Sequence, residues 1–221
     1  LAKDKMMLWG ICLLAALTAV PLFAILGEVL LRGYDQFSWS FFTEPTPTAY
    51  KAMKAIEAGE PIPGGIANGI IGTMIMLSMA VVVAVPLGIL CGAFLAENSK
   101  SRFAQVVSYL TDLLQGTPSV IIGIITYIWV VVPMKGYSAI AGSVALCIMM
   151  LPLIIRSTEE TLKILPSSLK EAGLALGGNS ARVMMKVQLP AAFGGIFTGV
   201  LLAISRVIGE TAPLMFTALG C

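Results

Sequence analysis

The sequence predicts an all-α, polytopic membrane protein, and three observations support this prediction. Hydrophobic residues make up 57% of the 221 residues and charged residues 12%, and the mean hydropathy of +0.92 is far too high for a soluble domain of this length. Five apolar runs are each long enough to cross a hydrocarbon core, which takes about 20 helical residues. The runs are continuously apolar rather than alternating, so a helical bundle is expected and barrel strands are not.

The five runs divide the chain. We expect spans at about residues 6–31, 69–95, 103–132, 136–155 and 191–208. The first run is too long for the apolar region of a cleaved signal peptide, so we interpret it as a permanent helix that Gly33 ends. The expected parts are an N-terminal transmembrane helix at 1–32, an external loop at 33–68 and a membrane core at 69–221, with a cytoplasmic loop at 156–190.

Basic residues favour a cytoplasmic N-terminus. This orientation places nine Lys and Arg residues inside and four outside, in agreement with the positive-inside rule: inside are Lys3, Lys5, Lys100, Arg102, Arg156, Lys163, Lys170, Arg182 and Lys186, and outside are Arg32, Lys51, Lys54 and Lys135. It also brings aromatic residues to the outer interface, where they are enriched in membrane proteins; these are Tyr34, Trp39, Tyr127, Trp129 and Tyr137.

The external loop is rich in proline, with Pro45, Pro47, Pro61 and Pro63, so most of it is expected to lack regular structure. Between the prolines, residues 49–58 can form a short surface helix that Gly59 is placed to end. We interpret the loop as a connector in solvent or at the membrane interface rather than as a binding site.

Small residues and prolines mark the spans that follow. Two glycine pairs, Gly88 with Gly92 and Gly195 with Gly199, are spaced to let helices approach closely, so we expect packing seams there. In the third run, Gln115-Gly116-Thr117-Pro118 predicts a kink or break, because proline lacks a backbone donor and disfavours helix in the residue before it. A structural kink and a functional cavity both remain open. Asp112, one turn earlier, favours the functional reading.

The polar loop before the fifth span predicts two short helices. Pro166 suits a first helical turn, and Ser168 with Glu171 matches a capping box. Gly177-Gly178 can then adopt positive backbone dihedrals and turn the chain sharply. Asn179 or Ser180 is placed to cap the second short helix, which joins the fifth span at Pro190. An ordered polar loop between membrane spans suggests a docking surface.

The spacing within this loop carries a family resemblance. Glu171-Ala172-Gly173, three residues, Gly177, nine residues, Val187, one residue and Leu189-Pro190 resembles the EAA loop of MetI-like ATP-binding-cassette (ABC) importer permeases. The spacings all match; Gly173 replaces alanine and Val187 replaces isoleucine. The resemblance implies that a short coupling helix docks on a separate ATPase subunit and that Glu171, Ala172, Gly173, Gly177, Leu189 and Pro190 carry the coupling. Gly173 is expected to loosen the first helix slightly.

Charged residues at the outer end of the fifth span point to a pathway. Arginine costs about 2.5–3.5 kcal/mol at a bilayer centre on insertion scales, so Arg206 is expected to face protein or water and to find a partner. Glu210, one turn later, is the nearest candidate. A self-neutralising structural pair and a functional pair both remain open, and the hydroxyls of Ser205 and Thr211 can serve as donors or as polar packing.

The same segment narrows the resemblance. Arg206 followed by Ile208-Gly209-Glu210-Thr211-Ala212-Pro213-Leu214 resembles phosphate importer permeases, and of the two permeases that such importers pair, the one with Ala-Pro after Gly-Glu-Thr fits better. The likeness covers nearly the whole chain, with supporting stretches at Gly64-Gly65-Ile66, Gly72-Thr73, Pro86-Leu87-Gly88, Gly116-Thr117-Pro118-Ser119 and Leu151-Pro152.

This resemblance implies a multi-pass permease of a bacterial or archaeal cytoplasmic membrane that is not itself an enzyme. Its substrate pathway would include Arg206, Glu210, Ser205, Thr211 and Asp112. Its partners would be an ATPase subunit, a second permease, a phosphate-binding protein outside the membrane and the lipid bilayer. No catalytic residue, metal or cofactor is expected.

Several functions are excluded or ranked lower. The chain has no Gly-Lys dipeptide, hence no Walker A phosphate loop, and no histidine for a triad, metal site or proton relay. Cys12, Cys91, Cys147 and Cys221 lack metal or redox spacing. The net charge is only +2 and the basic residues are scattered over several loops, which gives no support for a nucleic-acid partner.

Three alternatives remain: a sulfate, molybdate or amino-acid importer permease, an ion-gradient-driven transporter and, last, a hydrolase with an Asp112–Glu210 carboxylate pair. Because the chain starts at Leu1 and stops at Cys221 after the fifth span, we expect a partial polypeptide with a sixth span missing.

Overall fold

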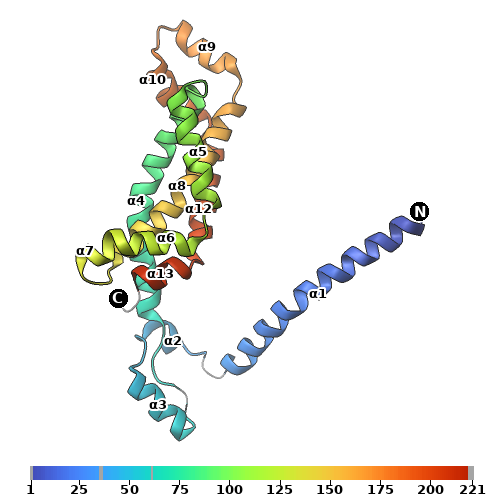
Figure 1. Ribbon diagram of the computed structural model, residues 1–221, viewed down its shortest axis with the longest axis vertical. Coiled ribbons are helices and arrows are strands. Elements are labelled where there is room, and N and C mark those ends of the chain that lie inside the picture. The colour runs from blue at the N-terminus through green and yellow to red at the C-terminus, as the bar shows by residue number, and fades with distance from the viewer. Residues whose placement is uncertain (1, 35–36, 61, 219–221) are drawn as a thin grey trace. The chain divides into compact units, whose positions relative to one another are not determined.

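The computed structural model describes residues 2–34, 37–60 and 62–218, apart from the side chains of residues 2–4 and 6. Within these ranges the secondary structure is helical, with no strand, as Figure 1 shows, so the predicted fold class is confirmed. Three helices are long and apolar enough to cross a membrane, and two further pairs of helices meet this test as bent spans, which makes up to five. The expected first, second and fourth runs therefore correspond to single helices and the third to a bent pair, while the fifth corresponds to Phe193–Ile208, the second half of the other bent pair.

Contacts divide the chain into two units, Leu1–Ile70 and Ile71–Cys221. The first unit holds α1 (Ala2–Gly33), α2 (Trp39–Thr43), α3 (Ala49–Ala58) and the first turn of α4 (Ala67–Glu97). The surface helix expected at 49–58 is present, and Gly59 ends it with φ +67°, a left-handed conformation that glycine adopts at little cost.

The second unit is built around α8 (Ala139–Ile164), which packs between α4 and α12 (Phe193–Ile208). Both predicted glycine seams face α8. A Cβ at Gly88 or Gly92 would collide with Ile154, Ile155 or Thr158, and a Cβ at Gly195 or Gly199 would collide with Thr161 or Ser157. The small residues therefore bring the backbones of α4 and α12 close to α8 from two sides, as helix packing in lipid requires.

The third apolar run is broken rather than kinked. Helix α5 (Arg102–Gly116) meets the segment Ser119–Met134 at 105°. That segment comprises α6 (Ser119–Thr126), the π-helical turn η2 (Tyr127–Val131) and α7 (Val132–Met134). Thr117 is extended, with ψ 131°, because the ring of Pro118 disfavours a helical conformation before it. The predicted break is confirmed at the predicted place.

The helix of the fourth apolar run is longer than the run itself. Helix α8 does not end near Ile155 but continues through the charged residues to Ile164. Arg156, Glu159 and Lys163 are spaced three and four residues apart and pair along the helix, which stabilises a charged helical turn.

The remainder of the chain forms short helices around the fifth span. These are α9 (Ser167–Ala175), α10 (Ser180–Val183), the π-helical turn η3 (Met184–Gln188), α11 (Leu189–Ala191) and, after α12, α13 (Ala212–Thr217). The segment Ser180–Ala191 is bent by 73° from α12. Figure 1 places α9 and α10 together at one end of the second unit, while α6 and α13 pack together at the other.

Candidate functional site

The loop formed by residues 165–192, which we call the coupling loop, is a folded knuckle of two short helices. Gly177 has φ +82° and turns the chain between α9 and α10. Asn179 caps α10, since its Oδ1 accepts a hydrogen bond from the Arg182 backbone N–H at 2.8 Å. The predicted glycine turn and the predicted Asn179 cap are therefore confirmed.

The capping box predicted at Ser168 and Glu171 is wrong. Helix α9 begins two residues earlier than this cap implies, at Ser167, with Pro166 at the capping position and no side-chain cap. The fixed φ of proline and the restriction that it places on its neighbour start the helix without help from a serine hydroxyl. Ser168 thus lies within the helix, and Glu171 is exposed and free to face a partner.

Gly173 has a packing role that the sequence did not reveal. Val183 is only 2% exposed, and a Cβ at position 173 would stand 2.9 Å from both of its γ carbons. Gly178 contacts the same valine, and its N–H donates to the Gly173 carbonyl at 3.2 Å. The glycine that replaces the alanine of the pattern therefore makes room for Val183, and the two helices close on one buried side chain.

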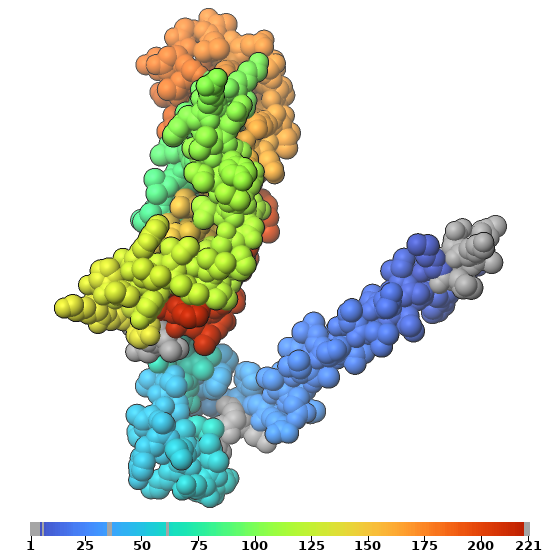
Figure 2. Space-filling model, in the orientation of Figure 1, coloured from blue at the N-terminus to red at the C-terminus, as the bar shows by residue number. Residues whose placement is uncertain are grey.

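The outer surface of the coupling loop is open to solvent. Glu171, Ala172, Gly177 and Pro190 are exposed, while Leu189 is half-buried against α12 and its neighbours. Leu176, at the turn, is 90% exposed. The loop residues, in orange, form a protruding end of the second unit in Figure 2. A folded knuckle with an exposed apolar tip is suited to docking, because a partner that covers the leucine removes apolar surface from water and so stabilises the complex.

The second candidate region lies around Arg206, near the end of α12. The predicted ion pair with Glu210 is absent from the described residues. Helix α12 stops at Ile208, and the Glu210 N–H donates a hydrogen bond to the Val207 carbonyl in a turn. Glu210 is therefore not on the next turn of the same helix, and Arg206 is an exposed cation without an acidic partner in this part of the chain.

A small cavity of about 10 Å³ lies beside Arg206, between α12 and the break in the third run; its lining includes Gln115, Thr117 and Pro152. This volume suits at most one water molecule. Thr117 donates its hydroxyl to the Leu113 carbonyl and Ser205 donates to the Leu201 carbonyl, so both hydroxyl protons are engaged within their own segments. Thr211 is exposed.

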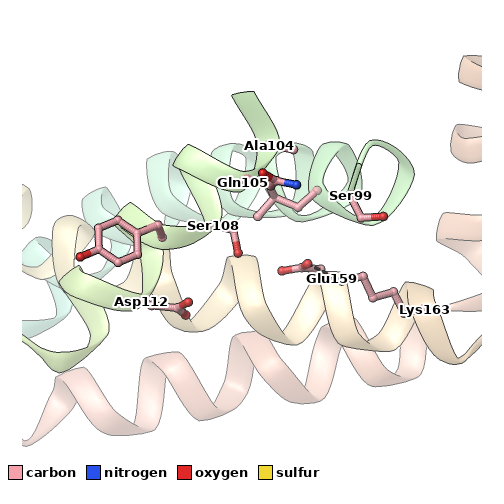
Figure 3. A pocket seen from close by; sticks show the side chains of 9 residues that line it. Ser99, Ala104, Gln105, Ser108, Asp112, Glu159 and Lys163 are labelled. Carbon is pink, nitrogen blue, oxygen red and sulfur yellow. Dashed lines mark hydrogen bonds and ion pairs between the residues drawn. The ribbon is translucent and has the colours of Figure 1, made fainter. Parts of the chain in front are cut away.

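Asp112 lies in a different cluster from Arg206. Its Oδ1 accepts from the Arg156 Nε at 2.9 Å, and Arg156 also binds Glu159 at 2.6 Å and the Ser108 carbonyl at 2.9 Å. Lys163 completes the cluster through Glu159. Figure 3 shows Asp112, Ser108, Glu159 and Lys163 beside a pocket of about 280 Å³ between α5 and α8. Sequence spacing does not indicate a pair between Asp112 and Arg156, because the two residues are 44 positions apart. The spacing of Arg156, Glu159 and Lys163 is the signal that marks this cluster.

A third feature is an apolar groove of about 820 Å³. It runs along α4, η3 and α12, and it is lined by Val81, Val85, Ile89, Met185, Leu189, Pro190, Phe193, Ile196, Phe197, Val200, Leu201 and Ile204. No side chain in this lining can donate a hydrogen bond.

The sequence profile of the family described as "Binding-protein-dependent transport system inner membrane component" matches residues 84–220, which include the coupling loop and Arg206. The chain belongs to this family. Its members are inner-membrane components of transport systems, which agrees with the several apolar helices of the described residues.

Relatives within the family carry more specific names. The chain is 41% identical over 197 residues to a "Phosphate transport system permease protein PstA" of Yersinia pestis, covering 89% of this chain and 63% of the relative. A protein of the same name from Haemophilus influenzae is 38% identical, with 89% and 66% covered. The chain thus spans somewhat less than two thirds of the length of these relatives.

A solved structure supports the fold. A chain of the MetNI methionine ABC transporter in an inward-facing conformation aligns with a TM-score of 0.57 at 19% identity, covering 76% of this chain and 74% of that chain. The helical architecture is therefore similar to that of this ABC transporter chain, in agreement with the predicted fold class. At this identity the likeness concerns the fold alone.

Within the described residues, no group of three or more His, Cys, Asp or Glu side chains could hold a metal ion. Cys12, Cys91 and Cys147 are free thiols. Cys221, the fourth cysteine of the sequence, lies outside the described residues.

Proposed function

We propose that the chain is a membrane permease subunit of an ATP-driven importer of inorganic phosphate. The observation that carries this proposal is the similarity to relatives named phosphate permeases, 41% and 38% identical over 89% of the chain, within a family of binding-protein-dependent transport components. A phosphate-binding protein outside the cytoplasmic membrane would deliver the anion, and a second permease of the PstC type would complete the pathway. A separate ATPase subunit would supply the energy.

In this proposal the coupling loop receives the force. Its exposed face, with Glu171, Ala172 and Gly177, would dock on the ATPase subunit. Leu189 and Pro190 would pass the movement into α12, since the chain runs directly from the loop through α11 into that helix. The buried Val183 supports this role, because a loop with its own packed interior can move as one body.

Arg206 is proposed to bind phosphate during transit, with Glu210, Ser205 and Thr211 nearby. Its guanidinium offers several N–H donors to an oxyanion and stays charged at neutral pH. No carboxylate of the described residues forms an ion pair with it. Glu210 would accept a hydrogen bond from a protonated phosphate oxygen, which sulfate lacks at neutral pH. The cavity beside Arg206 is too small for the anion, so the anion would meet Arg206 on the exposed side of this residue. Asp112 is engaged by Arg156 and would contribute only if that pair opened.

The test is uptake of labelled phosphate by cells that lack their own phosphate permease and express this full protein with its companion subunits. We expect uptake that continues when the proton gradient is collapsed but stops when ATP is depleted, and that excess unlabelled sulfate does not reduce. Uptake that stops with the ion gradient while ATP persists would favour a secondary transporter. Competition by sulfate at equal concentration would favour a permease for another oxyanion.

A further inference from the structure

Glu97, the last residue of α4, binds both short helices of the coupling loop. Its Oε1 accepts a hydrogen bond from the Lys170 ammonium of α9 at 2.5 Å and another from the Ser180 hydroxyl of α10 at 2.8 Å. The Glu97 side chain is 25% exposed and that of Lys170 36%, so the contact is partly shielded from water. One carboxylate oxygen thus joins the two halves of the loop to a transmembrane helix.

The course of the chain gives this contact its importance. The loop continues from α8 at one end and into α12 at the other, whereas α4 has no chain connection to it. An apolar cluster with Ala93 of α4, Met184 and Leu189 links α4 to the second end of the loop, but it contains no residue of α9 or α10. Among the residues that the structure describes, Glu97 is the transmembrane-helix side chain that hydrogen-bonds to α9 and α10.

The geometry of this contact is directional. A hydrogen-bonded ion pair fixes the distance and orientation of its partners more narrowly than apolar contact does. Holding α9 and α10 by the same oxygen also keeps the glycine turn between them closed at the end of α4. Without Glu97, the loop would keep its chain connections to α8 and α12 and the apolar contact of Met184 and Leu189 with α4, but α9 and α10 would lose their hydrogen bonds to α4.

We propose that Glu97 is a positioning residue for energy coupling: it holds the coupling loop to α4, so that a displacement of the loop moves α4 together with α8 and α12. This inference rests on the proposed function, because it assumes that an ATPase subunit displaces the loop. The pattern that marks the loop lies wholly within residues 171–190, so it gives no indication of this residue.

The test uses the complete importer reconstituted in lipid vesicles and measures phosphate transported per ATP hydrolysed. Glu97→Gln keeps the size of the side chain and removes its charge, and we expect the ratio to fall about two- to fivefold, as the loss of a half-exposed ion pair implies. Lys170→Gln should have a similar effect. The exchange of charges, Glu97→Lys with Lys170→Glu, should restore most of the ratio. Glu57→Gln, an exposed glutamate of α3, is the matched control and should leave it unchanged.

An unchanged ratio in Glu97→Gln would overturn the inference. If the ratio is unchanged because ATP hydrolysis and transport fall equally, together with the thermal stability, the role of Glu97 is purely structural. A wild-type importer that moves no phosphate would refute the proposed function instead. In that case spin labels at Ser99 and Leu174 test separately whether Glu97 holds α9 at the end of α4. Their distance distribution should broaden in Glu97→Gln, and identical distributions would refute the positioning role.

Discussion

Arg206→Gln is expected to lower phosphate uptake by about 10- to 100-fold while the protein remains folded and assembled. The fall corresponds to the loss of charge-assisted hydrogen bonds, each worth about 1.5–3 kcal/mol. Folding should be unaffected, because the Arg206 side chain is exposed and forms no ion pair within the described residues. Initial rates of labelled phosphate uptake, set against the amount of protein in the membrane and the ATPase subunit that copurifies with it, measure both effects.

Two further variants define what Arg206 contributes. Arg206→Lys keeps the charge but loses the two-pronged geometry, so its uptake should lie between those of the wild type and Arg206→Gln. Arg102→Gln removes an exposed arginine at the start of α5 and should leave uptake unchanged. Normal uptake by Arg206→Gln would remove this residue from the pathway, and loss of the folded protein would show that its role is structural.

Arg156→Gln, unlike Arg206→Gln, is expected to destabilise the fold, with a loss of about 2–3 kcal/mol in the free energy of unfolding. The Arg156 side chain is 19% exposed and neutralises Glu159, which is 6% exposed. Breaking a buried ion pair typically costs about 3–5 kcal/mol, because one charge remains without its partner; here Lys163 still binds Glu159, which reduces the loss. Thermal unfolding of the purified protein in detergent, followed by near-UV circular dichroism, measures it.

Asp112→Asn is the matched control for this prediction. Asp112 binds the same arginine but its side chain is 60% exposed, so its replacement should cost less than about 1 kcal/mol. If Arg156→Gln unfolds at the wild-type temperature, the cluster that joins α5 to α8 does not stabilise the fold. If Asp112→Asn instead lowers uptake without lowering stability, Asp112 belongs to the pathway after all.

The elements that the sequence predicted are those that depend on local chemistry. Apolar length marked the spans, Pro118 marked the break, and Gly59, Gly177 and Asn179 ended or capped helices as their backbone preferences require. The glycine pairs were recognisable as seams because small residues have one main use between helices in lipid. That both seams face α8 depends on how the helices are arranged and could not be read from the pattern.

Contacts between distant segments were missed or misassigned. Arg206 was paired with Glu210 on the assumption that the helix continued, whereas it ends at Ile208. The place of Asp112 in the pathway stays a prediction, but its bond to Arg156 could not be predicted, because the two residues lie in different helices. The reason for Gly173 was missed as well, since the residue that needs the space, Val183, lies beyond the turn. The last two depend on tertiary contacts that have no signature in sequence spacing, and the first on where a helix ends.

If the coupling loop is a cytoplasmic docking surface, Leu176 at its exposed turn should be accessible only from the cytoplasm and only without the ATPase subunit. In a protein whose four native cysteines are replaced, Leu176→Cys should react with a membrane-impermeant maleimide in inverted vesicles stripped of the ATPase subunit. It should not react in intact cells, and rebinding the ATPase subunit should protect it. Labelling from outside intact cells, or labelling that the bound ATPase subunit does not reduce, would contradict the account.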